Sequence, residues 1–173
     1  NAASFNTKAI SSNVDGNLDW TPQCSEIQQG KYLVSFKATD DGDPNLVDFH
    51  SLFVKVIAPE PKNLSSTVLT NAISIKWDKT GCNQALKYKI YRKQGPSGWI
   101  PSYCETGIPA FTGFQIIGET NSINDTIYVD SNNGLGLISG ANYCYRVIAV
   151  YPDGSESRAS DEVCDQLRKD VPI

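Results

Sequence analysis

The sequence predicts an all-β fold made of antiparallel β-sandwich modules, on three observations. Apolar and aromatic residues alternate with polar ones at a period of two in several short runs, which is the pattern of half-buried strands. Clusters of Gly, Pro, Asn and Asp separate these runs and indicate turns. No stretch sustains a 3.6-residue apolar period, so we expect essentially no long helix.

The first part of the chain contains two predicted strands joined by a turn. Apolar and polar side chains alternate over residues 32–38 and again over residues 50–56. The segment between them, residues 40–45, reads Asp-Asp-Gly-Asp-Pro-Asn and is a dense turn signal.

A domain boundary is predicted at Ala58-Pro59-Glu60-Pro61, because two prolines stiffen an extended segment and prevent a strand ladder from continuing. We therefore expect a β module over residues 1–58, a second domain over residues 59–167, and a linker to a further domain over residues 168–173.

The second domain contains most of the predicted strands, and the strongest of them lies near its end. The strand segments are residues 73–77, 87–92, 116–117, 126–129 and 143–149. Regularly spaced strands without helices are typical of a sandwich or a barrel. A long loop over residues 94–114 interrupts this spacing, and a loop of that length needs an anchor in a compact domain.

Charge and hydropathy exclude two classes of partner. The net charge is −4, and the 15 basic residues are scattered among 19 acidic ones, so we expect no nucleic-acid partner. No apolar run is long enough to cross a bilayer, so we expect no direct membrane insertion.

The five cysteines indicate an oxidising compartment rather than a metal site. They are Cys24, Cys82, Cys104, Cys144 and Cys164. None belongs to a C-x-x-C pair and the sequence has a single histidine, so zinc is not expected. Two disulfides and one remaining thiol are the better interpretation.

Cys144 and Cys164 are the first predicted pair. Each lies ten residues from Gly154, within a predicted hairpin turn over residues 151–155. An antiparallel ladder folded about that turn places the two cysteines opposite one another. The alternative is that one strand bulges and the thiols face apart.

Cys82 and Cys104 are the second predicted pair, because a disulfide between them would anchor the long loop and offset about 3 kcal/mol of its ordering entropy. Cys24 then has no assigned partner.

Residues 59–167 resemble a fibronectin type III domain. The likeness rests on Pro61, on Trp77 at the end of an Ile-x-Ile-x-Trp strand, on Val129-Asp130, and on Leu137 followed six residues later by Tyr143. The resemblance implies structural roles for Trp77 and Tyr143, the latter as the tyrosine corner whose hydroxyl bonds to upstream backbone. It implies the fold and says nothing about a ligand.

A narrower resemblance concerns large Bacteroidetes surface proteins of the gliding-motility-associated, type IX-secreted kind. It rests on Cys82-Asn83, on residues 104–109 (Cys-Glu-Thr-Gly-Ile-Pro) and on residues 142–147 (Asn-Tyr-Cys-Tyr-Arg-Val). It implies a secreted or outer-cell-surface location. Asn63 and Asn124 begin N-x-S/T sequons, and Asp125-Thr126-Ile127 resembles a short O-glycosylation motif of such proteins.

Residues 1–58 resemble the C-terminal part of an Ig-like or cadherin-like repeat, through Gly16-x-x-x-Trp20 and Phe36-x-Ala38-Thr39-Asp40. They are too few for a full seven-strand sandwich of about 100 residues. We therefore expect a truncated module whose sheet has an exposed edge.

The acidic turn is a weak candidate for Ca²⁺. Its carboxylates belong to Asp40, Asp41, Asp43 and Asp48, and carboxylate oxygens are the ligands that calcium prefers. The segment 58–61 lacks the acidic pattern that supplies further ligands in cadherins. We expect a solvated turn and no cofactor, with Ca²⁺ as the alternative.

The long loop is a candidate ligand-binding surface because it carries Trp99, Tyr103, Phe111 and Phe114. Exposed aromatic rings on an anchored loop can bind a sugar or a peptide. The alternative is a lid packed over an open flank of the sandwich.

Catalysis is not expected. A nucleophilic triad could use only His50, which lies in a predicted strand where a structural role is favoured. We predict a non-catalytic extracellular structural or adhesion module that spaces or displays binding regions beside neighbouring β-sandwich domains. Its partner would be a protein or glycan at the cell surface. The alternative is a carbohydrate-binding accessory module of a secreted polysaccharide-degrading protein, with a hydrolase fragment a distant third.

Overall fold

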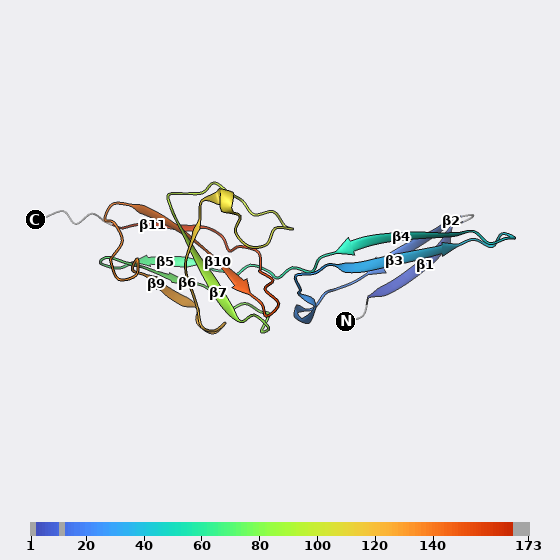
Figure 1. The fold of residues 1–173 in the computed structure, drawn as a ribbon, viewed down its shortest axis with the longest axis horizontal. Coiled ribbons are helices and arrows are strands. Elements are labelled where there is room, and N and C mark those ends of the chain that lie inside the picture. Colours follow the sequence, from blue (N-terminus) through green and yellow to red (C-terminus); the bar gives the residue numbers. More distant parts are fainter. Residues whose placement is uncertain (1–2, 11–12, 168–173) are drawn as a thin grey trace, which may run out of the picture.

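The computed structural model describes residues 3–10 and 13–167, and these residues form an elongated all-β molecule (Figure 1). A β-sandwich occupies one end and two β-hairpins occupy the other. The described part of the chain holds two short 3-10 helices, η1 (Cys24–Glu26) and η2 (Ala110–Thr112), and no helix in it could span a membrane. The predicted linker over residues 168–173 lies outside the described residues.

Seven strands make the sandwich, and all of their pairings are antiparallel. One sheet has the order β5-β6-β9, and the other has the order β11-β10-β7-β8. The strands are β5 (Ser65–Val68), β6 (Ile73–Lys76), β7 (Lys87–Gln94), β8 (Gln115–Glu119), β9 (Ile127–Asp130), β10 (Asn142–Val150) and β11 (Val163–Gln166). This confirms the predicted antiparallel β-sandwich, and the architecture is fibronectin type III-like.

The core lies between the two sheets and is filled by the inward positions of each strand. Trp77, Tyr88 and Tyr145 are its largest members, each at most 1% exposed. The rings of Trp77 and Tyr88 meet edge to face with centroids 5.2 Å apart, which is a favoured arrangement for aromatic pairs. The period-two pattern in the sequence of β6, β7 and β10 therefore marks the residues of each strand that point into the core.

One carboxylate is buried in this core and is fully partnered. Asp130 is 2% exposed, and both of its oxygens lie 3.0 Å from Nη1 of Arg92. The Tyr145 hydroxyl donates to it at 2.9 Å, and the N–H of Asn132 donates at 3.0 Å. Burial, followed by the charge of Asp130, raises the pKa of Tyr145 far above its ordinary value. The tyrosine therefore stays protonated as a donor.

The tyrosine corner has the geometry that the resemblance implies. Tyr143 is 6% exposed, and its hydroxyl accepts a hydrogen bond of 3.1 Å from the N–H of Ile138. That bond ties the segment before β10 to the strand itself.

The chain returning from β10 to β11 contains two buried serines that complete the strand ladder. Near the turn Val150 pairs with Glu156, whereas Cys144 pairs with Cys164, so the returning segment carries two extra residues. The Ser157 Oγ accepts from the N–H of Ala149 and the Ser160 Oγ from that of Val147, both at 2.9 Å. The serine hydroxyls thus replace backbone partners displaced by the irregularity.

The N-terminal part consists of two hairpins. Strand β1 (Ser4–Ile10) pairs with β2 (Asn13–Asp19), and β3 (Tyr32–Thr39) pairs with β4 (Val47–Val54). Sequence patterning did not identify β1 and β2, because their apolar face is weak: along β2 it consists of Val14, Gly16 and Leu18, which alternate with polar residues. The hairpins meet through Phe36 against Phe5, with centroids 5.4 Å apart, and Tyr32 lies 5.1 Å from Trp20.

We predict that Ser160→Ala and Ser157→Ala each lower the free energy of unfolding by about 1–3 kcal/mol, because each leaves a buried N–H of β10 without an acceptor. Urea denaturation followed by tryptophan fluorescence measures this. Ser65→Ala, which removes an exposed serine hydroxyl, is the matched control and changes stability by less than about 0.5 kcal/mol. Equal effects at all three serines would contradict the proposed role of the hydroxyls.

Candidate ligand-binding loop and its anchors

A single buried arginine holds the long loop between β7 and β8. Arg146 lies on the face of β10 that points away from the core, and it is 4% exposed. Its guanidinium donates to the carbonyls of Ser160 at 2.6 Å and Trp99 at 2.8 Å, and to Glu162 Oε2 at 3.2 Å. The Trp99 ring lies 4.8 Å from Cζ of Arg146, a cation–π distance. Phe114, 5% exposed, adds a second ring at 5.9 Å.

Glu162 completes this anchor by binding the start of the loop. Its Oε1 accepts the N–H of Ser97 at 2.8 Å, and its Oε2 accepts the Ser97 hydroxyl. Burial by itself would raise the pKa of this carboxyl. The hydrogen bonds from Ser97 and the charge and hydrogen bonds of Arg146 outweigh burial, so the pKa of Glu162 is lowered from its ordinary value of 4.5.

A second anchor holds the middle of the loop. The N–H of Gly107 donates to the Ser157 carbonyl at 2.9 Å. Gly107 has a φ of 72°, and a side chain there would collide with Glu156, so this position requires glycine. Cζ of Arg158 lies 5.1 Å from the Tyr103 ring.

The four predicted aromatic residues do not form one binding platform. Trp99 and Phe114 pack inward against Arg146, as the lid alternative expected, whereas Tyr103 is 84% exposed and Phe111 is 79% exposed. Ile100, 87% exposed, is a further apolar residue that sequence reasoning missed because it considered only aromatic side chains. The outward set is therefore Ile100, Tyr103 and Phe111.

Sequence reasoning also missed Arg146 and Glu162. A usable signal existed, because Arg146 is the one charged residue within the run Tyr143–Val150 of the strongest strand. A charge inside such a run is either exposed or paired.

The cysteine pairing is partly as predicted and partly corrected. Cys144 and Cys164 are bridged, with Cα atoms 4.0 Å apart. Cys82 is bridged to Cys24, and Cys104 is a free, exposed thiol, so the predicted Cys82–Cys104 bridge is wrong. Cys82 is bonded to the η1 segment that connects the two hairpins, and the loop is anchored through Arg146 without sulfur.

The Cys24–Cys82 disulfide joins the η1 segment to the end of the sandwich. The Cα atoms are 5.3 Å apart, and 58 residues separate the two cysteines. Cys24 and Ile27 pack against the sandwich core. The N–H of Gln29 donates to Asp153 Oδ2 at 2.6 Å. Hydrogen bonds from the Ser155 hydroxyl and N–H, and then from Gln29, lower the pKa of Asp153. We call this set of contacts the joint.

The segment between the hairpins and the sandwich is part of the joint. Ala58 is fully buried, and its carbonyl accepts from the N–H of Arg158 at 3.0 Å. Arg158 also pairs with Glu60 at 3.2 Å. The joint encloses a cleft of about 330 Å³ whose polar lining includes Gln28, Lys55, Thr106 and Glu156.

In the acidic turn, the Asp40 carboxylate accepts hydrogen bonds from backbone N–H groups of the turn itself. Asp40 Oδ1 accepts from the N–H groups of Gly42 at 3.2 Å and Leu46 at 2.7 Å. Among the described residues, the one group of three possible metal-ligating side chains within reach of a single ion is Cys144, Glu162 and Cys164, whose cysteines are bridged to each other. Asp40, Asp41, Asp43 and Asp48 form no such group.

The remaining singled-out residues lie apart from the loop. His50 is exposed on β4, paired across the ribbon with Phe36. Asn63 donates to Asp78 at 2.7 Å, and Asn124 accepts from Lys79 at 2.8 Å. Both asparagines are exposed, and Thr126 is half-buried.

Comparisons with known proteins give a likeness of fold. No protein-family model matches the sequence, and no curated protein matches it. A solved fibronectin type III-like protein of Clostridium thermocellum is 23% identical, with a TM-score of 0.47, over 66% of this chain and 97% of its own. The chicken CNTN1 FN1–FN3 domains are 12% identical, with a TM-score of 0.47, over 96% of this chain and 55% of theirs. A two-domain chicken tenascin segment is 14% identical, with a TM-score of 0.43, over 80% and 65%.

We predict that Glu162→Gln lowers the free energy of unfolding by about 1–3 kcal/mol at neutral pH, because it removes the charge that faces buried Arg146. The folded-state pKa lies below 4.5, so the stability that Glu162 contributes is present above that pH and is lost as the pH falls through the folded pKa. The difference between the variant and the parent protein should therefore shrink as the pH falls below 4.5 and through the folded-state pKa.

Urea denaturation at several pH values measures this difference. Glu119→Gln, which removes an ion pair that is about one-third exposed, is the control and should cost less than about 1 kcal/mol at neutral pH. A Glu162→Gln effect that stays constant down to the acid-unfolding range would contradict the role assigned to the carboxylate.

Proposed function

We propose that this chain is a non-catalytic spacer of an extracellular protein, in which two β units are held as one stiff rod. The observation that carries the proposal is the joint. A disulfide, a backbone hydrogen bond to Asp153 and a buried connecting segment all act between the same two units. A spacer must transmit position from one end to the other, and a flexible linker would not.

The covalent chemistry supports an extracellular setting. Two disulfides are rare in a reducing cytosol and common in secreted and cell-surface proteins. Membership of a large Bacteroidetes surface protein exported by the type IX system is a finer proposal. The sequence of residues 104–109 and 142–147 supports this proposal. It specifies the bacterial group and the export route in addition to the cell-surface location.

The domain organisation belongs to the same proposal. Residues 1–58 would be an Ig-like module, residues 59–167 the fibronectin type III-like domain, and residues 168–173 a connection onward. Neighbouring β-sandwich domains would continue the rod at both ends.

We predict that Cys24→Ser/Cys82→Ser releases the joint while the sandwich stays folded. Small-angle X-ray scattering should show a broader distance distribution than in the parent protein, and near-ultraviolet circular dichroism should retain the sandwich signal. Loss of this 58-residue closure should also cost about 4 kcal/mol or less.

Cys104→Ser, which leaves both bridges intact, is the matched control and should scatter like the parent protein. If the double variant kept the parent distance distribution, the disulfide would not be what stiffens the rod.

A carbohydrate-binding accessory role is the second candidate function, and one observation favours it. Tyr103 and Phe111 are exposed on a loop that Arg146 and Gly107 fix to the sandwich. Aromatic rings held in place bind sugar faces with little loss of conformational entropy.

We predict that, if this second function holds, Tyr103→Ala/Phe111→Ala lowers binding on a glycan array about tenfold or more, since each ring would supply on the order of 1 kcal/mol. Trp99→Ala is the comparison, because that ring packs on Arg146 and should change stability more than binding. The absence of any bound glycan would remove the carbohydrate-binding role and leave the spacer role intact.

A further inference from the structure

The β3–β4 hairpin has one face that packs on its neighbour and one apolar face that does not. Phe36 and Tyr32 point toward β1–β2 and the segment after it. Because side chains alternate along a strand, the residues between them point the opposite way. We call this opposite side the outer ribbon face. It consists of Leu33, Ser35, Lys37, Thr39, Val47, Phe49, Ser51 and Phe53.

The outer ribbon face exposes large apolar side chains close together. Leu33 is 60% exposed and lies directly opposite Phe53, which is 68% exposed. Phe49 is also 68% exposed, and Val47 is 48% exposed. The Ser35 and Ser51 hydroxyls, 2.8 Å apart, lie between the Leu33–Phe53 pair and Phe49. Scattered single apolar residues are ordinary at a surface, but large apolar side chains gathered on one face mark an interaction site.

The outer edge of β4 is also open, and the residues whose backbone N–H and C=O groups face that edge can be identified. Among the described residues β4 pairs only with β3. The N–H of Asp40 donates to the Leu46 carbonyl at 3.1 Å, so the 40/46 pair is hydrogen-bonded. In an antiparallel ladder such pairs alternate with non-bonded ones. The N–H and C=O groups of Val47, Phe49, Ser51 and Phe53 therefore point away from β3, into the open edge. The Phe49 N–H donates there to Asp48 Oδ1 at 2.9 Å, a contact that the carbonyl of a partner strand would replace.

We propose that β4 binds β4 of a second copy of this chain, antiparallel, about a two-fold axis at Ser51. The two phenylalanines lie two residues on either side of Ser51. An axis there places Phe49 of each copy opposite Phe53 of the other. The backbone groups of these residues are the ones that face the open edge, so each pair is also hydrogen-bonded. The product is one four-stranded sheet with the order β3-β4-β4-β3.

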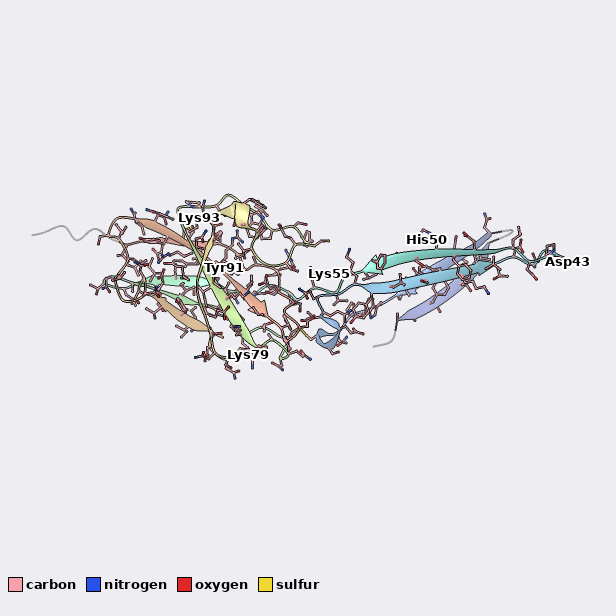
Figure 2. All side chains as sticks on the ribbon, viewed as in Figure 1. Asp43, His50, Lys55, Lys79, Tyr91 and Lys93 are labelled. Carbon is pink, nitrogen blue, oxygen red and sulfur yellow. A yellow bond between two sulfur atoms is a disulfide. The ribbon has the colours of Figure 1, made fainter. Side chains whose placement is uncertain are left out.

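The charges of β4 agree with this register. On the face toward β1–β2, His50 would lie opposite Leu52 and Asp48 opposite Val54, so no like charges oppose each other. Lys55 would lie opposite Val47, next to the acidic turn of the other copy. Figure 2 shows Asp43 at the tip of the hairpin, His50 partway along it and Lys55 near the sandwich. The two sandwiches would therefore lie at opposite ends of the shared sheet.

A second copy fits better than an unrelated strand, because this edge is self-complementary. A two-fold interface requires the same surface on both copies to match itself, and the two phenylalanines, the central serine and the opposed lysine and acidic turn meet that requirement. This inference goes beyond the spacer function and does not depend on it.

Charge substitutions at the two phenylalanines test the register by sedimentation equilibrium of the full chain in a Cys104→Ser background. Phe49→Lys/Phe53→Lys places lysine opposite lysine twice and should raise the dimer dissociation constant about tenfold or more. Phe49→Lys/Phe53→Glu removes the same two rings but places lysine opposite glutamate twice, and it should dimerise more tightly than the double lysine variant. Mixing the double lysine variant with Phe49→Glu/Phe53→Glu should give a heterodimer.

A cross-link gives an independent measurement. In the Cys104→Ser background, Ser51→Cys should oxidise to a covalent dimer, since residues on the axis have Cα atoms about 5.5 Å apart. Leu52→Cys is the control, because the two copies of that residue would be offset along the strands and should not bridge. A parent chain that stays monomeric up to its solubility limit, equal behaviour of the two charge variants, or equal cross-linking at positions 51 and 52 would overturn the proposal.

Discussion

The constraint that organises the sandwich is that β10 is buried on both of its faces. From Tyr143 to Val150 every side chain is buried, although only one face of the strand meets the opposite sheet. A small two-layer sandwich leaves the outer face of each sheet to solvent, so the outer side of β10 needs a cover. The long loop supplies this cover by laying Trp99 and Phe114 over Arg146. The guanidinium can stay buried because the loop and the returning segment provide acceptors for it.

The strength of the apolar alternation decides which strands could be predicted from sequence. Strands β3, β4, β6, β7 and β10 could be predicted because their alternation has a strong apolar phase, whereas the apolar phase of β1 and β2 is weak and has Gly16 at its centre. The need for a loop anchor could be predicted from loop length. The anchor itself could not, because an arginine contacts the loop through its position in three dimensions, and nothing in the spacing of Arg146 and Trp99 specifies that contact.

The cysteines show the same division between local and non-local information. Cys144 and Cys164 lie across one hairpin, so counting from its turn is enough, even though the returning strand carries two extra residues that Ser157 and Ser160 accommodate. The Cys24–Cys82 bridge depends on how the η1 segment docks on the sandwich. Treating residues 1–58 as a separate unit concealed that partner, and the thiol assigned to the loop is the one that the folded chain leaves exposed.

Burial is concentrated in the sandwich half of the chain. Of the residues from 3 to 55 whose side chains are described, none is fully buried, so the hairpins have no core of their own and depend on the joint for their placement. A two-stranded ribbon is marginal in isolation, and an apolar outer face adds a further cost in water. Pairing at the edge of β4 would reduce both costs at once, because it extends the sheet and covers the phenylalanines. The sandwich, by contrast, has a core of its own, and its strand β10 is already covered on both sides.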